Sequence, residues 1–212
     1  MEPLPKRRLT REETRQQTRD RLLAAAAELF AERGVSGTPV EQIAERAGFS
    51  RGAFYGNFDD KNDLVRELLL RRTQAELREV QAMAADAASF AEVLDRLRAW
   101  NRARAEHLTS WLSLRLELLL HALRNPELRG PLAEREELAQ GAIGEGIRQE
   151  LARRGVATPP ADPASLALIA HALEDGLLIQ RLLTPDRISA EVVVDAVELL
   201  LDSWAALGAT PG

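Results

Sequence analysis

The sequence predicts an all-α fold, and three observations support this prediction. Apolar residues recur at three- and four-residue spacing along most of the chain, as they do on one face of an α-helix. Helix-start signals alternate with Gly and Pro residues that are typical of helix ends. The sequence contains no strand-like alternation, internal repeat or low-complexity tract.

Length and composition narrow the class of protein. At 212 residues, the chain has room for one small and one larger helical domain. It contains no cysteine, which excludes disulfides and thiolate metal sites. No apolar run is long enough to span a bilayer, and the N-terminus lacks the apolar core of a secretion signal. We therefore expect a cytoplasmic protein that makes no membrane contact.

The first helix is expected to begin at a capping box formed by Thr10 and Glu13 and to end at Gly34. Its core face comprises Leu22, Ala25, Ala26, Leu29 and Phe30. Seven basic and three acidic residues between Lys6 and Arg21 give a local charge of +4, although the whole chain carries −5. A solvated arm and an arm that contacts nucleic-acid phosphates both fit this local charge.

A helix-turn-helix pattern follows between Thr38 and Lys61. Thr38 is expected to cap the first short helix, with Pro39 at its first position and Glu41 completing a capping box. Gly48 suits the left-handed residue after that helix, and Ser50 can cap the second one. A generic helical hairpin is the alternative, but it does not explain the short second helix with a polar start.

Further helices follow to the end of the chain. Asp60 and Asp63 can cap a fourth helix, which runs to about residue 82 and packs Leu64, Leu68 and Leu69 inward. Later helices are expected at about 90–106, 111–124, 131–154, 163–183 and 189–207, with Asp162 and Pro163 supplying a cap and a first-turn proline.

The residues around the motif resemble a known family. The run T-R-D-R-L-L-A-A-A-A-E-L-F-A-E-R-G-V-S-G-T, then I-A-E-R-A-G-F-S-R-G-A-F-Y-G-N-F and K-N-D-L, closely resembles the N-terminal domain of TetR-family transcriptional regulators. The resemblance covers about residues 16–76 without a gap. Many members have His where this chain has Asn57, and Thr-Leu where it has Ala53-Phe54.

The motif and the resemblance together indicate how DNA would be bound. Arg51 is the first candidate for a base contact, because its guanidinium can bond guanine O6 and N7. Gly52 and Ala53 are small enough to let the backbone approach closely, and the resemblance implies a phosphate contact for Lys61. The candidate DNA-binding residues are Thr38, Ser50, Arg51, Gly52, Ala53, Tyr55, Asn57 and Lys61.

The last two long helices each carry an apolar face. The resemblance implies that they form a four-helix bundle with a second subunit, while burial within their own domain is the alternative. The candidate homodimer interface is Leu166, Ile169, Leu173, Leu177, Val193, Val197, Leu200 and Trp204.

A second set of residues suits a small-molecule site, because it combines aromatic rings with a few polar groups. A core stripe with snorkelling arginines explains the same pattern. The candidate ligand-binding residues are Trp100, Arg104, His107, Trp111, Arg115, His121, His171 and Glu174. Gly141, Gly144 and Gly146 lie within one expected helix. They allow either close packing against a neighbour or a less rigid helix that changes its packing when a ligand binds.

The sequence therefore predicts a basic arm at 1–15, a helix-turn-helix domain at 16–76 with its motif at about 39–58, and an effector-binding and dimerisation domain at 77–208. We interpret the chain as a dimeric regulator, a repressor that binds a palindromic double-stranded DNA operator and is released by an unidentified small molecule. A helical small-molecule-binding module without specific DNA binding is the alternative. An enzyme is disfavoured because no catalytic motif is present, and neither a cofactor nor a metal ion is expected.

Overall fold

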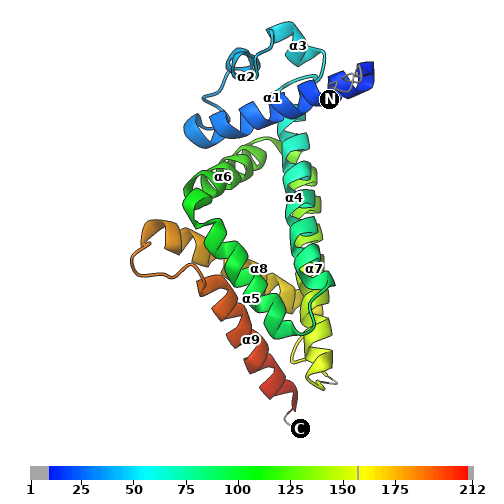
Figure 1. The fold of residues 1–212 in the computed structure, drawn as a ribbon, viewed down its shortest axis with the longest axis vertical. Helices are drawn as coiled ribbons and strands as arrows, with labels where there is room; N and C mark the ends of the chain where they lie inside the picture. Colours follow the sequence, from blue (N-terminus) through cyan, green and yellow to red (C-terminus); the bar gives the residue numbers. More distant parts are fainter. Residues whose placement is uncertain (1–9, 157, 210–212) are drawn as a thin grey trace, which may run out of the picture. The chain divides into compact units, whose positions relative to one another are not determined.

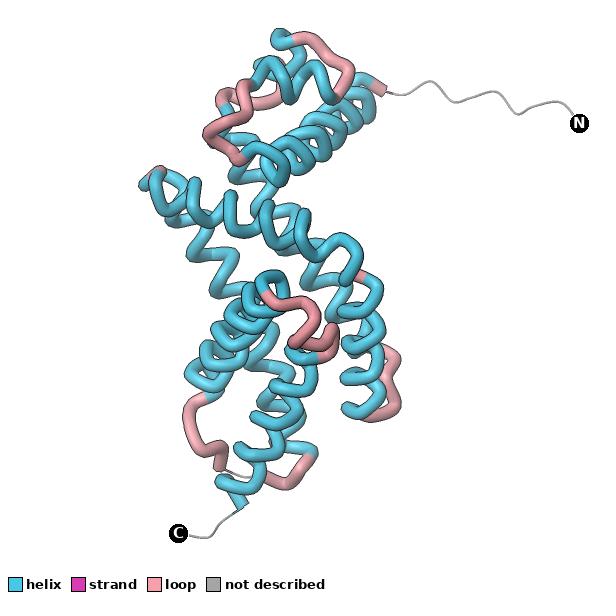
Figure 2. Tube along the Cα trace, turned by 90° about the vertical axis from the view of Figure 1, so that its left-hand side faces the viewer, coloured by secondary structure: helices cyan, strands magenta, loops and turns pink. Residues whose placement is uncertain are grey.

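The computed structural model describes residues 10–156 and 158–209, and the secondary structure within them is helical (Figures 1 and 2). The α-helices are α1 (Arg11–Arg33), α2 (Val40–Arg46), α3 (Arg51–Tyr55), α4 (Lys61–Ala85), α5 (Phe90–Ala103), α6 (Leu108–Arg124), α7 (Arg129–Arg153), α8 (Pro163–Leu183) and α9 (Val192–Ala209). Two 3-10 helices, η1 (Ala105–His107) and η2 (Pro126–Leu128), flank α6. Among the described residues, no helix has both the length and the apolar character needed to cross a membrane.

The chain divides into two compact units. The first comprises the chain up to Leu68 together with Ser113–Leu128, and the second comprises Leu69–Leu112 and the chain from Arg129 onward. Most of α6 thus belongs with the helix-turn-helix region by its contacts, although the sequence suggested one boundary near residue 76. A local sequence pattern cannot show this, because the assignment depends on contacts between distant segments.

Helix α1 begins and ends as predicted. The Thr10 hydroxyl accepts a hydrogen bond from the Glu13 amide, and the Glu13 carboxylate accepts one from the Thr10 amide, which confirms the capping box. Gly34 ends the helix with a φ of 76°, in the region that favours glycine. All five predicted core residues of α1 are buried.

The turn between α2 and α3 also follows its sequence signals, except at its start. Gly48 has a φ of 78°, as expected for a residue that reverses the chain after a helix. The prediction that Thr38 caps α2 is wrong: Pro39 occupies the N-cap position, and no side chain caps the helix. The capping box with Glu41 is therefore absent as well.

The second unit is built around α7, α8 and α9, which pack against one another. Its core cluster is Ile147, Leu151, Val156, Leu166, Ala170, Leu201 and Trp204. Leu166 and Trp204 were expected at a dimer interface, and this expectation is wrong, since both are buried inside their own domain. Gly144 is buried against α8, where an added Cβ would lie 3.4 Å from the Ala167 Cβ, so this glycine packs closely on a neighbouring helix. Gly141 and Gly146 have open space around the Cβ position.

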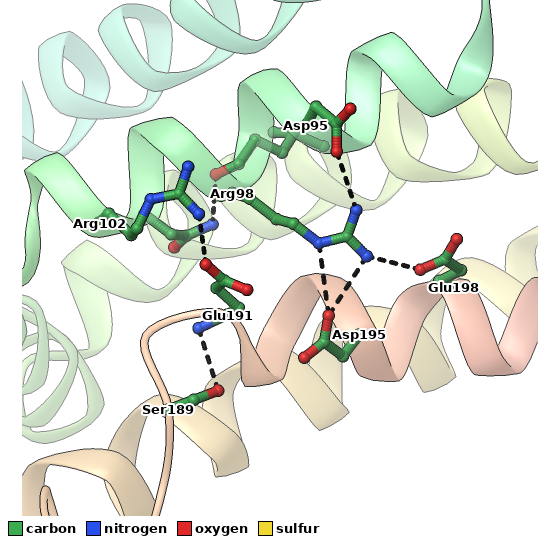
Figure 3. Close-up of polar contacts among 9 residues, drawn as sticks. Asp95, Arg98, Arg102, Ser189, Glu191, Asp195 and Glu198 are labelled. Atoms are coloured by element: carbon green, nitrogen blue, oxygen red, sulfur yellow. Dashed lines mark hydrogen bonds and ion pairs between the residues drawn. The ribbon is translucent and has the colours of Figure 1, made fainter.

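Ion pairs join α5 to α9 along one side of this unit (Figure 3). The guanidinium of Arg98 lies 2.6 Å from Glu198 and 3.3 Å from Asp195, both on α9. One turn later, Arg102 pairs with Glu191 in the segment before α9. These contacts fix α5 against α9, so α5 has a defined position within the unit.

Candidate nucleic-acid interface

The second helix of the motif, α3, is held by its cap and its aromatic residues. The Ser50 hydroxyl accepts a hydrogen bond from the Ala53 amide at 3.3 Å, which confirms Ser50 as the N-cap. Phe54 is fully buried and packs edge-on against the Tyr55 ring, 5.4 Å away. The anchored Phe54 leaves the opposite face of this short helix directed to solvent.

Arg51 and Tyr55 lie on that solvent-exposed face. The side chain of Arg51 is 64% exposed and lies 3.0 Å from the Glu41 carboxylate of α2. Its guanidinium carbon lies 5.5 Å from the centre of the Tyr55 ring. A hydrogen bond with Tyr55 and the charge of Glu41 raise the pKa of Arg51, so this residue keeps its positive charge. The arrangement presents a fork of N–H donors at the surface.

Gly52 is exposed and lies between these two residues. A Cβ added there would meet only the Ser50 hydroxyl, at 3.7 Å, which is an ordinary contact. The φ of Gly52 is not positive either. Neither the backbone conformation nor the surrounding packing therefore requires glycine at this position.

Two predicted DNA-contacting residues are directed into the domain instead. Thr38 is fully buried, and its hydroxyl donates to the Gly34 carbonyl at 2.7 Å, because the last carbonyls of α1 lack helical partners. Lys61 is half-buried, and its ammonium donates to the carbonyls of Val35 at 2.7 Å and Thr38 at 3.2 Å. Burial lowers the pKa of Lys61. Both side chains hold the turn after α1.

Asn57 also makes internal contacts. Its side-chain amide nitrogen donates to the Ala53 carbonyl at 2.8 Å, while its backbone carbonyl accepts a hydrogen bond from the Arg19 guanidinium. Arg19 additionally pairs with Glu67 and lies 4.3 Å over the Phe58 ring. Asn57 and Arg19 thus fasten the end of α3 to α1.

Only part of the predicted basic arm can be described. Lys6, Arg7 and Arg8 lie outside the described residues. Arg11 and Arg15 are exposed within the first turns of α1, so this part of the arm is helical.

The predicted ligand-binding residues fall into separate places. Trp100, Arg104 and Trp111 come together in the second unit, where the Arg104 guanidinium carbon lies 3.9 Å from one ring centre and 4.5 Å from the other. The 3-10 helix Ala105–His107 lies between α5 and α6, and His107 is exposed on it.

Arg115 and His121 belong to the first unit. His121 Nε2 lies 2.7 Å from Asn62 Oδ1, and Asn62 in turn donates to Glu127. Burial and the nearby charge of Lys61 lower the pKa of His121, in keeping with a neutral ring that donates from Nε2. His121 therefore ties α6 to α4 within this unit.

His171 joins a polar network that crosses three helices of the second unit. Its Nε2 lies 2.8 Å from Glu136 on α7, and its Nδ1 lies 3.8 Å from Glu174 on α8. Glu136 pairs with Arg135, whose guanidinium lies 4.0 Å from Glu76 on α4. Glu76, Arg135 and Glu136 could not be predicted from the sequence, because each is an ordinary charged residue on its own helix and only the packing brings them together.

Comparison with known proteins agrees with this geometry. The family model of bacterial regulatory proteins of the tetR family matches residues 22–68, which include α2 and α3. The model of the C-terminal domain of BetI-type transcriptional repressors matches residues 90–206. TtgR, an HTH-type transcriptional regulator of Pseudomonas putida, is 31% identical over 191 residues, covering 85% of this chain and 87% of TtgR.

Solved structures show the same architecture. A crystal structure of a TetR-family protein from Rhodococcus sp. has a TM-score of 0.69 at 28% identity, covering 89% of this chain and 96% of that one. SmeT, the repressor of the Stenotrophomonas maltophilia multidrug efflux pump SmeDEF, has a TM-score of 0.60 at 25% identity, covering 92% and 96% of the two chains. Since the exposed helix-turn-helix and both family models occur in one chain, and the second model spans more than half of it, this protein belongs to the TetR family of transcriptional regulators.

Proposed function

We propose that this regulator is a repressor that binds a palindromic operator as a homodimer and is released by a small-molecule effector. Among its relatives, SmeT and the HTH-type transcriptional repressor AcnR of Corynebacterium efficiens are both described as repressors. The alternative of a ligand-binding module without specific DNA binding leaves the exposed face of α3 without a role.

The presence of a glycine at position 52, on the exposed face of α3, is the observation that supports DNA binding most directly. A glycine inside a helix costs about 1 kcal/mol relative to alanine, and no contact among residues 10–156 and 158–209 requires glycine at position 52. A surface that must approach a DNA backbone closely does require a residue without a side chain. Gly52 is flanked by Arg51, which can read guanine, and followed by Tyr55, which can reach a phosphate.

We revise the set of residues that we assign to DNA contact. Arg51, Gly52, Ala53 and Tyr55 form the proposed contact face of α3. Ser50 caps the helix that presents this face. We assign positioning roles to the side chains that bond inside the domain, namely Thr38, Asn57 and Lys61.

Gly52→Ala separates DNA binding from folding. The variant should unfold at the same or a higher urea concentration than the wild type, because alanine favours the helix. It should also bind the DNA that flanks its own gene at least about fivefold more weakly, a difference of roughly 1 kcal/mol. A gel shift at several salt concentrations measures the second effect. Gly146→Ala is the matched control, since Gly146 also has open space around its Cβ position but lies in α7. If Gly52→Ala binds operator as tightly as Gly146→Ala, close approach at α3 is refuted.

A homodimer is supported by apolar residues that α8 and α9 leave exposed. Leu168, Ile169 and Leu183 on α8 are between 49% and 68% exposed, and Leu199 and Leu207 on α9 are 68% and 63% exposed. Gly176 on α8 has open space around its Cβ position, which would allow a second helix to come close. A two-fold pair of recognition helices then reads two half-sites about 34–36 Å apart.

Effector release follows from a two-state argument. An operator accepts one spacing between two recognition helices, and a ligand that favours another spacing weakens DNA binding by its differential affinity. The residues that we assign to the effector lie in the second unit, around Trp100, Trp111 and Glu76.

A further inference from the structure

Two tryptophans of the second unit enclose a positive charge that belongs to the chain itself. Arg104 lies at the C-cap of α5, and its guanidinium carbon is 3.9 Å from the ring centre of Trp100 and 4.5 Å from that of Trp111. Both distances are within the range of a cation–π contact. Arg104 is 25% exposed, and both rings are half-buried, so solvent reaches the group.

Carboxylates on α4 hold the two rings by their edges. The Trp100 indole N–H donates to Glu79 at 2.9 Å, and the Trp111 indole N–H donates to Glu76 at 3.1 Å. Glu76 and Glu79 are three residues apart, so they lie on the same side of α4. Because each indole N–H is engaged at the ring edge, the electron-rich ring faces stay directed at the space that Arg104 occupies.

Three arginines surround one of these carboxylates. Glu76 lies 3.7 Å from Arg72, 3.9 Å from Arg104 and 4.0 Å from Arg135. Each of these distances exceeds the usual length of a charge-assisted hydrogen bond, about 2.7–2.9 Å. Arg104 is thus one of three cationic neighbours of Glu76. When Arg104 moves away, Arg72 and Arg135 remain, and the cluster has lost one positive charge.

We propose that Trp100 and Trp111 form a cage for an organic monocation, and that this cation binds by displacing the Arg104 guanidinium. A quaternary ammonium or guanidinium head group fits the cage, because it brings one positive charge and a face that stacks on indole rings. An anion does not fit, since it would meet the ring faces and the carboxylates of Glu76 and Glu79. The proposal rests on the proposed function, because it names the effector class of this regulator.

Displacement of Arg104 has a direct structural consequence. The Arg104 amide donates to the Trp100 carbonyl at 3.1 Å, and the Arg104 carbonyl accepts from the His107 amide at 3.0 Å. The residue thus links the end of α5 to the 3-10 helix that precedes α6. A cation that displaces the Arg104 side chain therefore acts next to the junction between α5 and this 3-10 helix.

A charged probe and its uncharged isostere test the cage. Phenyltrimethylammonium and tert-butylbenzene have nearly the same shape and differ by one positive charge. Calorimetric titration of the full-length protein should show that the cation binds at least about tenfold more tightly than its isostere. Arg104→Gln should bind the cation at least about threefold more tightly than the wild type, since the internal competitor is gone. Trp111→Leu should weaken cation binding by about tenfold relative to the wild type. Trp111→Phe keeps an aromatic face, so its affinity should lie between those of the wild type and Trp111→Leu.

Two controls make the result readable. Arg102→Gln removes a neighbouring arginine that pairs with Glu191 and should leave cation binding unchanged. Urea unfolding of each variant checks that a loss of binding is not a loss of folding. Equal binding of the two probes, or no gain in Arg104→Gln, overturns the cage.

Operator binding distinguishes this proposal from the proposed function. If the protein binds operator DNA in a gel shift but binds the two probes equally well, the proposed cation cage is refuted and the proposed DNA-binding function is not affected. If the cation binds as expected but leaves operator affinity unchanged, the cage is supported and effector release is refuted.

Discussion

The amide of Val35 donates a hydrogen bond to the Glu117 carboxylate of α6 at 3.2 Å, across 82 residues of sequence. The carbonyl of the same residue accepts one from the Lys61 ammonium of α4 at 2.7 Å. The Val35 side chain is fully buried, and the backbone amide and carbonyl of this residue each bond a charged side chain from a distant helix. The Thr38 amide also donates to the Val35 carbonyl, at 3.4 Å. Gly34 next to it has a φ of 76°, so a residue with a side chain would be strained there, and its Cβ would lie 2.8 Å from the Glu117 carboxylate and displace it.

We predict that Glu117→Gln destabilises the protein by roughly 1 kcal/mol. Glutamine keeps an acceptor for the Val35 amide but loses the charge that strengthens the bond. Urea unfolding followed by circular dichroism measures the loss. Glu134→Gln, at an exposed position of α7, serves as the control and should leave the midpoint unchanged. A Glu117→Gln midpoint equal to that of the control contradicts the prediction.

Lys61→Met should destabilise the protein more, by about 1–3 kcal/mol, because it removes the ammonium donor from the carbonyls of Val35 and Thr38. If Lys61 contributes to DNA binding only by holding this turn, the variant should bind all DNA sequences more weakly by the same factor. The slope of log affinity against log salt concentration should then stay unchanged. A direct phosphate contact would instead reduce that slope by about one. Gel shifts between 50 and 200 mM salt, roughly the range over which phosphate contacts are resolved, decide between these roles.

Local signals in the sequence predicted the helix boundaries well. The capping box of Thr10 and Glu13, the turn at Gly48 and the cap at Ser50 all appear as expected. Each depends on residues within about four positions of one another, so the chemistry can be read without knowing the fold. Asp162 likewise caps α8, with Pro163 at the first position.

Competing and distant contacts explain what could not be predicted. Thr38 has the residue type and spacing of a cap for α2, yet its hydroxyl bonds the carbonyl of Gly34, four residues earlier at the end of α1. The neighbours of Trp111 were also hidden, since Glu76 lies 35 positions away on α4. The apolar faces of α8 and α9 were visible in the sequence, but which of their residues face the core depends on how these helices pack against α7.

Arg51→Ala should weaken the free energy of operator binding by about 1–3 kcal/mol and relax the sequence preference at one position of each half-site. The exposed side chain makes surface contacts, an ion pair with Glu41 and contacts with Tyr55, so the fold should be unaffected. Glu41→Gln should act in the opposite direction, because it removes a negative charge that competes with DNA for Arg51. A selection of bound sequences from a randomised pool measures the preference. Unchanged preference in Arg51→Ala would remove Arg51 from the base contacts.

Exposed and buried apolar residues of α8 and α9 should respond differently to charge. Ile169 is 49% exposed and Leu199 is 68% exposed, whereas Leu166 is 1% exposed in the core. Ile169→Glu combined with Leu199→Glu should sediment as a folded monomer and lose operator binding, because a dimer interface would bury unpaired charges. Leu166→Glu should unfold instead. Sedimentation velocity at micromolar concentration would contradict the proposed interface if the double variant remained dimeric.

The last prediction concerns pH and the buried His171. A hydrogen bond with Glu136 on α7 and the Glu174 carboxylate 3.8 Å away on α8, helped by the charge of Asp175, raise the pKa of His171 to about 9. The unfolded chain should titrate near 6.5, so between these two values the folded state holds a proton that the unfolded state has lost. The stabilising contribution is therefore complete below pH 6.5 and is lost as the pH rises toward 9.

The expected loss is on the order of 3 kcal/mol across that window, because one pKa unit corresponds to about 1.4 kcal/mol. Urea unfolding at pH 6.5 and 9 should show it in the wild type. His171→Gln should abolish most of the difference, while His107→Gln, at an exposed position of η1, should retain it in full. Equal pH dependence in the two variants would mean that the proton is held elsewhere and that the contacts of His171 with Glu136 and Glu174 do not bind it.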